Sequence, residues 1–290
     1  MITSPLGLVA GEGVFPLLVA QGARAMGRKV ICVGFRGIAW PQLEAASDRF
    51  EWASVARPGK WFRVLRAHGC REAILVGRVK KDQMHDRFLV LKNLPDWKAI
   101  KLWWTVLRKD KRPQTGLTAM ANLFASEGVP LIDSTAYCKE HLAGSGAMTK
   151  RQPTAAQWDD IHFGWDRCAT ISRLDIGQAI AILKRDVVAV EAIEGTNAMI
   201  ERAGHLCRAG GWICIKVSNK HQDMRLDVPS VGTTTIEKLH AARASCLVLE
   251  PGKTIMLERP KVIELADKLG IAIVGYEPGH GGDGSGGQST

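Results

Sequence analysis

Three charged side chains alternate with apolar ones near residue 225. Asp223, Arg225 and Asp227 are separated by single apolar residues in the stretch QDMRLDVP. Extended over 222–228, this stretch would project all three charged groups from one face. Carboxylates bind hard cations such as Mg²⁺, and a guanidinium can bind a phosphate through two hydrogen bonds. The spacing therefore predicts either a site for phosphate-ester chemistry or an amphipathic strand with a solvated, salt-bridged face.

Further acidic residues lie near a predicted strand edge in the same half of the chain. Glu191 and Glu194 occur in the stretch EAIEGTN. Gly195 allows close approach of the backbone to a ligand, and Thr196 can cap the helix that follows. Grouped with the carboxylates near residue 225, these acids predict a metal site, although each one alone could be a plain surface residue.

A glycine-rich loop near the N-terminus is a candidate anion site. Gly11, Glu12 and Gly13 follow an apolar run and precede a helical pattern, so helix N–H groups could face a phosphate. An ordinary tight turn explains the loop equally well. The third glycine of the GxGxxG pattern is missing, which argues against a standard dinucleotide-binding fingerprint.

Two cations precede a predicted helix in the middle of the chain. Lys150 and Arg151 lie in TKRQPT, and together with helix-end N–H groups they could hold an anion. With Arg225, they could share the charge that develops on a reacting phosphate. The alternative is a basic linker between domains.

The net charge of +10 is concentrated in one segment. Residues 78–112 hold eleven Lys or Arg against four Asp, with Trp97, Trp103 and Trp104 among them. This composition suits an anionic membrane surface or another anionic partner, and a nucleic-acid groove is less favoured because no known motif accompanies it. A solvated helix with its tryptophans in the core explains the segment equally well.

Localisation is predicted from what the chain contains. It has no apolar run of about 18 residues that could span a bilayer and no secretory signal pattern. Its seven cysteines are scattered without a CxxC pair, which favours reduced thiols. We expect a cytoplasmic protein, peripheral to the inner face of the cytoplasmic membrane.

Alternating strand and helix patterns predict two α/β domains. The first, residues 1–135, has strand patterns at 6–10, 29–35, 73–77 and 129–133 with helices between them, as expected for a Rossmann-like parallel sheet. The second, residues 136–277, has strand patterns at 175–183, 187–192, 212–217, 222–228, 246–249 and 271–274. The Gly- and Ser-rich tail, residues 278–290, is expected to be disordered.

An ordered series of motifs resembles a known family. The stretches are LVAGEGVFP (8–16), VGRVK (76–80), TKRQP (149–153), DIHFG (160–164), LDIGQA (174–179), AVEAIEGTNAMI (189–200), QDMRLDVPSVG (222–232) and residues 266–275. In this order they are similar to the LpxI-type UDP-2,3-diacylglucosamine pyrophosphatases of lipid A biosynthesis. The resemblance covers nearly the whole chain except the tail.

The resemblance implies two α/β domains that hold the substrate between them. It implies Mg²⁺-dependent hydrolysis of the pyrophosphate of UDP-2,3-diacylglucosamine to UMP and 2,3-diacylglucosamine 1-phosphate. Water is expected to attack the phosphorus on the sugar side. No nucleic acid is expected as a partner, and a homodimer is a reasonable expectation.

Residue roles carried over by the resemblance centre on Asp227, the aspartate of the R-x-D-x-P stretch and the expected catalytic acid. The predicted catalytic residues are Asp227, Arg225 and Lys150, and the predicted metal ligands are Asp227, Asp223, Glu191 and Glu194. The predicted substrate-binding residues are Gly11, Glu12, Gly13, Arg78, Arg151, Gln178, Gly195, Thr196 and Gln222. The chain departs from the family pattern at Asn197, where Asp is expected, and at 111–114, where an acidic stretch is expected.

Two rival functions are consistent with parts of the sequence. The glycine loop after the first strand would suit a nicotinamide-dependent oxidoreductase with an atypical loop. The high isoelectric point, near 9.4, would suit a non-catalytic protein that binds polyanions or membranes. Cofactor binding would identify the first, and salt-dependent association without turnover would identify the second.

Overall fold

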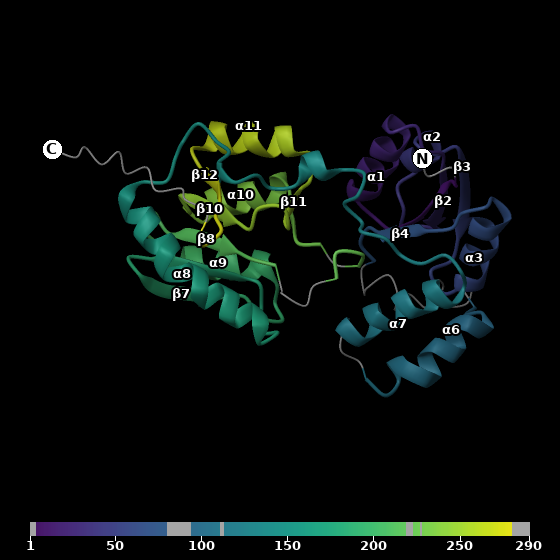
Figure 1. The fold of residues 1–290 in the computed structure, drawn as a ribbon. Coiled ribbons are helices and arrows are strands. Elements are labelled where there is room, and N and C mark those ends of the chain that lie inside the picture. Colours follow the sequence, from purple (N-terminus) through teal and green to yellow (C-terminus); the bar gives the residue numbers. More distant parts are fainter. Residues whose placement is uncertain (1–3, 80–93, 111–112, 219–222, 227, 280–290) are drawn as a thin grey trace. The chain divides into compact units, whose positions relative to one another are not determined.

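The computed structural model describes residues 4–79, 94–110, 113–218, 223–226 and 228–279. The chain forms two compact units, the first of Met1–Cys138 with Asp223–Asp227 and the second of Lys139–Gln222 with Val228–Thr290. Each contains a sheet covered by helices, so the predicted two-part α/β fold is confirmed (Figure 1). Residues 280–290 of the predicted tail lie outside the described residues. No described helix is both long enough and apolar enough to cross a bilayer.

The first unit is built on a parallel four-stranded sheet, called sheet A. Its order is β3 (Arg49–Ala53), β2 (Val30–Phe35), β1 (Leu6–Ala10) and β4 (Ala73–Val76). All three strand pairs are parallel, as predicted. Every residue of β1 and β2 is buried, which explains their continuous apolar sequence.

Helices cover sheet A. They are α1 (Phe15–Ala25), α2 (Gln42–Ala45), α3 (Pro58–Ala67) and α7 (Pro113–Ser126), while α6 (Trp97–Leu102) packs against α3 and a π-helical turn (Trp103–Leu107) packs against α7. Phe62 of α3 and Phe124 of α7 meet edge to face, with ring centroids 4.9 Å apart. Both are fully buried in one cluster with Val9 and Val33 of the sheet, so α3 and α7 pack on the same face.

Two details of sheet A differ from the sequence prediction. β3 was not predicted, because only alternate residues of this edge strand are shielded from solvent. The predicted strand at 129–133 is reduced to a single parallel bridge between Leu131 and Ala73. It still lies beside β4, because Ala73 donates to the Pro130 carbonyl and Ile132 donates to the Ala73 carbonyl, both at 3.0 Å.

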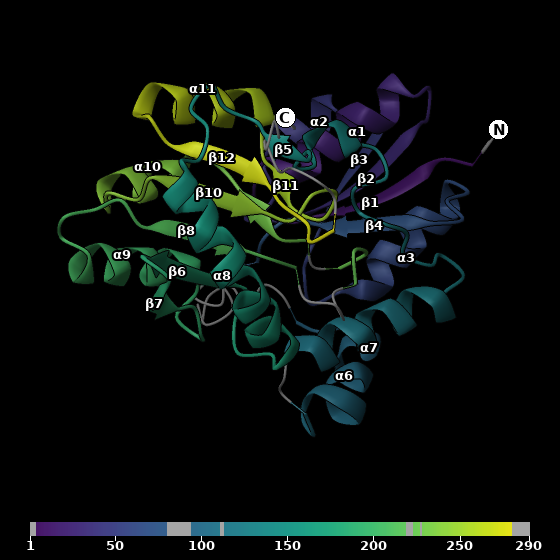
Figure 2. The ribbon, with the colours of Figure 1, turned by 60° about the vertical axis from the view of Figure 1, so that its left-hand side comes forward.

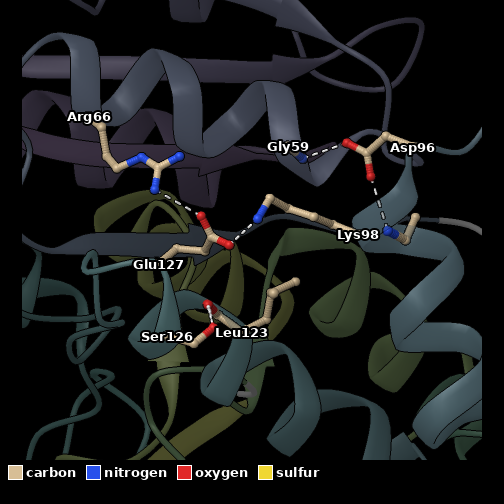
Figure 3. A network of polar contacts seen from close by, with 8 residues as sticks. Gly59, Arg66, Asp96, Lys98, Leu123, Ser126 and Glu127 are labelled. Carbon is tan, nitrogen blue, oxygen red and sulfur yellow. Dashed lines mark hydrogen bonds and ion pairs between the residues drawn. The ribbon is translucent and has the colours of Figure 1, made fainter.

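A network of polar contacts ties α6 to α3 and α7 (Figure 3). Asp96 caps α6, and its carboxylate also accepts a hydrogen bond of 2.6 Å from the Gly59 N–H at the start of α3. Glu127, which follows α7, lies 3.0 Å from Arg66 of α3 and also pairs with Lys98 of α6. These contacts fix the orientation of the segment that carries the three tryptophans.

The second unit is built on a mixed six-stranded sheet, called sheet D. Its order is β5 (Gly146–Ala147), β12 (Ala272–Gly275), β10 (Cys246–Leu249), β8 (Ile213–Lys216), β6 (Ala179–Leu183) and β7 (Asp186–Val190). The central strands β12, β10 and β8 run parallel, while β5 and β6 run antiparallel to their neighbours. The neighbouring strands β6 and β7 form an antiparallel hairpin, and the turn amides of Lys184 and Arg185 donate to the Asp160 carboxylate.

Helices cover both faces of sheet D (Figure 2). α9 (Thr196–Leu206), α10 (Thr233–Ala241) and α11 (Arg259–Leu269) share one core with Cys214 and Leu247 of the sheet. α8 (Ala155–Arg173) shares the other with Ile213 and Ile215. Neighbouring residues of a strand thus enter opposite cores, as the period of two requires. A short helix (Lys139–His141) and a small parallel pair, β9 (Ser230–Val231) and β11 (Ile255–Met256), complete the unit.

The predicted strand at 222–228 is wrong. The described residues form a turn over 224–226, closed by a hydrogen bond of 2.8 Å from the Leu226 N–H to the Asp223 carbonyl. The turn belongs to the first unit, not to the second domain in which the sequence pattern placed it. Leu226 packs against the core of sheet A even though the segment is not extended.

Candidate active site

The carboxyl edge of sheet A gathers the first group of predicted residues. Gly11 follows β1, and its N–H donates to the Val76 carbonyl of β4 at 2.8 Å. Glu12 and Arg78 then exchange two backbone hydrogen bonds of 2.9 and 2.8 Å, which joins the ends of the two strands. Ligands of parallel α/β sheets bind at this edge, so Gly11, Glu12 and Arg78 lie where the sequence interpretation requires.

Glycine is required at this junction by close backbone approach. A Cβ atom on Gly11 would lie 2.7 Å from the Arg78 carbonyl oxygen. Because that oxygen belongs to the backbone, the clash could be relieved only by moving the ends of β1 and β4 apart. Gly13 has a φ of +114°, a conformation that L-residues rarely adopt. The loop is therefore shaped by backbone packing, and α1 begins after it without a side-chain cap.

The turn that carries Asp223 and Arg225 is anchored to the first unit by Ser134. The Met224 carbonyl accepts hydrogen bonds from both the Ser134 hydroxyl, at 2.7 Å, and the Ser134 N–H, at 3.1 Å. Ser134 is 1% exposed and comes directly after the segment that lies beside β4. The turn is thus fixed at the carboxyl edge of sheet A.

Within the turn, Asp223 and Arg225 form a bidentate ion pair. The Arg225 Nε and Nη2 atoms lie 2.8 and 2.6 Å from the two carboxylate oxygens. Hydrogen bonding from Arg225 lowers the pKa of Asp223, so the carboxylate is ionised at neutral pH. Two of the three charged residues predicted for this site, Asp223 and Arg225, are therefore paired with each other in the structure. Asp227 and Gln222 lie outside the described residues.

A second group of predicted residues lies at the carboxyl edge of sheet D. Gln178 precedes β6, and its carbonyl accepts from the Val217 N–H just beyond β8. Glu191 follows β7, and its Oε1 accepts a hydrogen bond of 2.8 Å from the Thr196 hydroxyl at the start of α9. Gly195, with a φ of +82°, joins them.

Lys216 lies at the same edge and was not predicted. It is the last residue of β8, it is 8% exposed, and its Nζ donates to the Thr196 hydroxyl at 2.8 Å. The signal in the sequence was a lysine at the end of the apolar run WICIKV, where a core residue is expected. Ser134 was also missed, because nothing in the sequence indicates that its partner lies 90 residues away.

Glu250, also unpredicted, follows β10 at this edge. Its Oε2 accepts hydrogen bonds from the Ser218 N–H and hydroxyl at 2.8 and 2.7 Å, and Lys253 pairs with Oε1 at 2.9 Å. Burial works against the charged form, but the bonds from Lys253 and Ser218 outweigh it and lower the pKa of Glu250. These contacts hold the segment after β8 against the end of β10.

The predicted metal ligands differ in their readiness to bind a cation. Glu191 Oε2 is buried and has no hydrogen-bond partner among the residues that the structure describes, so it fits a cation ligand. Glu194 pairs with Arg202 at 2.9 Å, and both oxygens of Asp223 are taken by Arg225. The described residues contain no group of three or more potential metal-ligating side chains. Glu191 is thus the predicted ligand that this structure supports best.

Lys150 and Arg151 lie at the opposite edge of sheet D. The segment after β5 runs antiparallel to β12, so it reaches the amino end of that strand. The Lys150 N–H donates to Asp267 at 2.7 Å, and Arg151 donates to the Gly270 carbonyl at the end of α11. The structure therefore does not bring these two cations together with Glu191 and Thr196 within the second unit.

The cysteines are unsuited to nucleophilic catalysis. All seven are in the described part of the chain, buried and not joined by disulfides. Burial raises the pKa of Cys214 and of Cys246 to about 12, so these thiols stay protonated at neutral pH.

Together these features define an α/β protein of two units, each with charged and polar groups at the carboxyl edge of its sheet. Residues 5–141 match the LpxI N-terminal domain, and residues 144–274 match the LpxI C-terminal domain. The chain therefore belongs to the LpxI family. It is 30% identical over 283 residues to the UDP-2,3-diacylglucosamine pyrophosphatase LpxI of Caulobacter vibrioides, covering 94% of this chain and 98% of that protein. The family resemblance predicted from the motifs is confirmed.

Replacing Ser134 by alanine tests the anchor of the 223–226 turn. The Ser134→Ala change removes one of two hydrogen bonds to the Met224 carbonyl, which costs about 1 kcal/mol. The Leu226 amide, which closes the turn, should then exchange with solvent deuterium about fivefold faster by mass spectrometry.

Ser126→Ala is the matched control, because the exposed Ser126 hydroxyl also donates to a backbone carbonyl, that of Leu123 in its own helix α7 (Figure 3). Equal exchange at Leu226 in the wild type and both variants would show that Ser134 does not hold the turn.

Proposed function

We propose that this protein hydrolyses the pyrophosphate bond of UDP-2,3-diacylglucosamine in lipid A biosynthesis, releasing UMP and 2,3-diacylglucosamine 1-phosphate. The observation that carries the proposal is membership of the LpxI family across both domains, with a relative named for this activity aligned over 98% of its length. Water attacks the phosphorus on the sugar side.

The edge of sheet A supports this chemistry through Arg225 and Arg78. Both side chains are exposed, and Arg225 is held beside Asp223 in a fixed geometry. A guanidinium can bind non-bridging phosphate oxygens and stabilise the charge that develops on them. Asp227 lies two residues after Arg225 in the sequence and is the proposed catalytic, metal-associated carboxylate.

Magnesium is the proposed cofactor, and Asp227 and Glu191 are proposed as its ligands. Glu191 suits this role because its Oε2 is buried and has no hydrogen-bond partner among the described residues. A bound Mg²⁺ would neutralise the diphosphate and lower the pKa of water. Arg202 pairs with one oxygen of Glu194, whereas Arg225 binds both oxygens of Asp223, so Asp223 is the less available of these two carboxylates.

Exposed apolar residues support a substrate with acyl chains. Leu174, Ile176 and Ile193 are 66, 48 and 105% exposed, and all lie in loops at the carboxyl edge of sheet D. The two loops pack directly on each other, because a Cβ on Gly177 would lie only 1.9 Å from the Glu191 carbonyl oxygen. An apolar surface beside charged groups suits an acylated sugar phosphate.

Turnover measurements with an Asp227→Asn variant test the proposed reaction. Wild-type protein should release UMP from UDP-2,3-diacylglucosamine with Mg²⁺ and not with EDTA. The variant, which keeps the shape but not the charge, should lose at least about a hundredfold in kcat. Asp159→Asn, on an exposed residue of α8, is the control and should retain full activity.

Activity of folded Asp227→Asn equal to that of the wild type would remove Asp227 from the mechanism. UMP release that is unchanged by EDTA would exclude the metal from the reaction.

We also propose that the segment from 94 to 110 contacts an anionic membrane surface. Trp97, Trp103 and Trp104 are 75, 49 and 54% exposed, so the alternative that places them in the core is wrong. The Arg108 guanidinium stacks over the Trp104 ring at 4.5 Å, and Lys101 is exposed beside them. Tryptophans flanked by cations match the interface of an anionic bilayer.

Vesicle binding of a Trp103→Ala, Trp104→Ala double variant tests the membrane surface. Wild-type protein should sediment with vesicles that contain phosphatidylglycerol, less so at high salt, and the variant should bind about tenfold more weakly. Trp40→Ala, a change at an exposed tryptophan elsewhere in the first unit, should bind as the wild type does.

Equal binding by the double variant would contradict the proposal. Loss of a dimer in light scattering, without loss of vesicle binding, would instead assign the tryptophans to contact between two copies of the chain.

A further inference from the structure

Lys216 is a buried cation, and the described residues around it supply no ion-paired carboxylate to compensate its charge. It is 8% exposed at the end of the central strand β8. Its neighbours Cys214 and Ile215 enter the two cores of the unit, and by the period of two Lys216 projects to the face covered by α9. Burying an ammonium is unfavourable unless an opposite charge or several acceptors compensate.

The compensation visible in the described residues is incomplete. Lys216 Nζ donates to the Thr196 hydroxyl, and that hydroxyl donates to Glu191 Oε1. An ammonium has three donors, so two are left over as far as the described residues go, and no carboxylate among those residues lies within ion-pairing distance of it. Glu191 Oε2, on the other side of the same hydroxyl, is buried and also has no hydrogen-bond partner in the described part of the chain.

The surroundings of Lys216 favour an anionic ligand. α9 begins at Gly195 without a side-chain cap, so no capping side chain satisfies its first-turn N–H groups. A Cβ placed on Gly195 would meet nothing within 4 Å, which leaves this approach open. A spare ammonium, a helix N-terminus and a hydroxyl converge at one edge of the sheet, and together they match the donor set that proteins use for phosphate.

We propose that Lys216, oriented by Thr196, binds a phosphate oxyanion of the substrate at the carboxyl edge of sheet D. This inference rests on the proposed pyrophosphatase function. The phosphate belongs either to the nucleotide or to the sugar, and the chemistry of recognition is the same for both. A neutral side chain at position 216 would be buried at a lower desolvation cost than an ammonium. We therefore assign the charge of Lys216 to the binding of phosphate.

Calorimetric titration of a Lys216→Met variant tests the inference. UMP and glucosamine 1-phosphate are the two probes, each titrated with Mg²⁺ present. The variant should bind one of them about 10- to 100-fold more weakly than the wild type, as expected for loss of a charged hydrogen bond, and should raise KM. The probe that is affected identifies which phosphate Lys216 holds.

Lys238→Met is the matched control, since Lys238 is a partly exposed lysine of α10 that pairs with Glu201. It should bind both probes as the wild type does. If Lys216→Met does not fold, Thr196→Val serves instead: it removes the hydroxyl that orients Lys216 and should weaken the same probe, while Thr196→Ser should not.

Two outcomes separate the inference from the proposed function. If the wild type releases UMP but Lys216→Met retains wild-type affinities and KM, the inference is overturned and the function stands. If the wild type releases no UMP but Lys216→Met loses affinity for a phosphate probe, the site stands and the function is overturned.

Discussion

Parallel pairing of strands is the constraint on which both halves of the candidate site depend. In sheet A it brings the ends of β1 and β4 together, so that Glu12 and Arg78 exchange backbone hydrogen bonds. In sheet D it aligns β8 with β10, which pairs Lys216 with Leu249 at the ends of the two strands. Polar groups gather at these edges because the strands themselves are buried and apolar.

The 223–226 turn shows how one segment can be fixed without regular structure. The buried Ser134 donates to the Met224 carbonyl and so holds the backbone of the turn. The Leu226 side chain packs against the core of sheet A. Asp223 and Arg225 are paired before any ligand arrives. Pre-organisation of this kind reduces the entropy that a ligand must overcome when it binds.

Much of the fold could be predicted because most strands are short apolar runs bounded by glycine. The segments that failed are those whose pattern is ambiguous. Asp223 to Asp227 alternate like a strand, but five residues cannot distinguish a strand from a turn whose apolar residues reach a core. β3 was missed because its exposed residues dilute the apolar signal.

The sequence predicted many of the residues at the candidate site but not how the fold arranges them. The acids and glycines of EAIEGTN and the GEG loop lie at the expected edges, because local sequence sets strand ends and helix starts. Lys150 and Arg151 lie at the edge of sheet D opposite to Glu191 and Thr196, and their position depends on β5 pairing antiparallel with β12. Lys216 was missed although a lysine at the end of an apolar strand is a local signal, because the sequence does not show which groups surround it.

Turnover in ¹⁸O-labelled water, followed by mass spectrometry of both products, tests the proposed hydrolysis most directly. The proposal predicts one ¹⁸O atom in 2,3-diacylglucosamine 1-phosphate and none in UMP, because water attacks the phosphorus on the sugar side. Label in UMP would place the attack on the other phosphorus. The absence of both products, from protein shown to be folded, would contradict the proposed function.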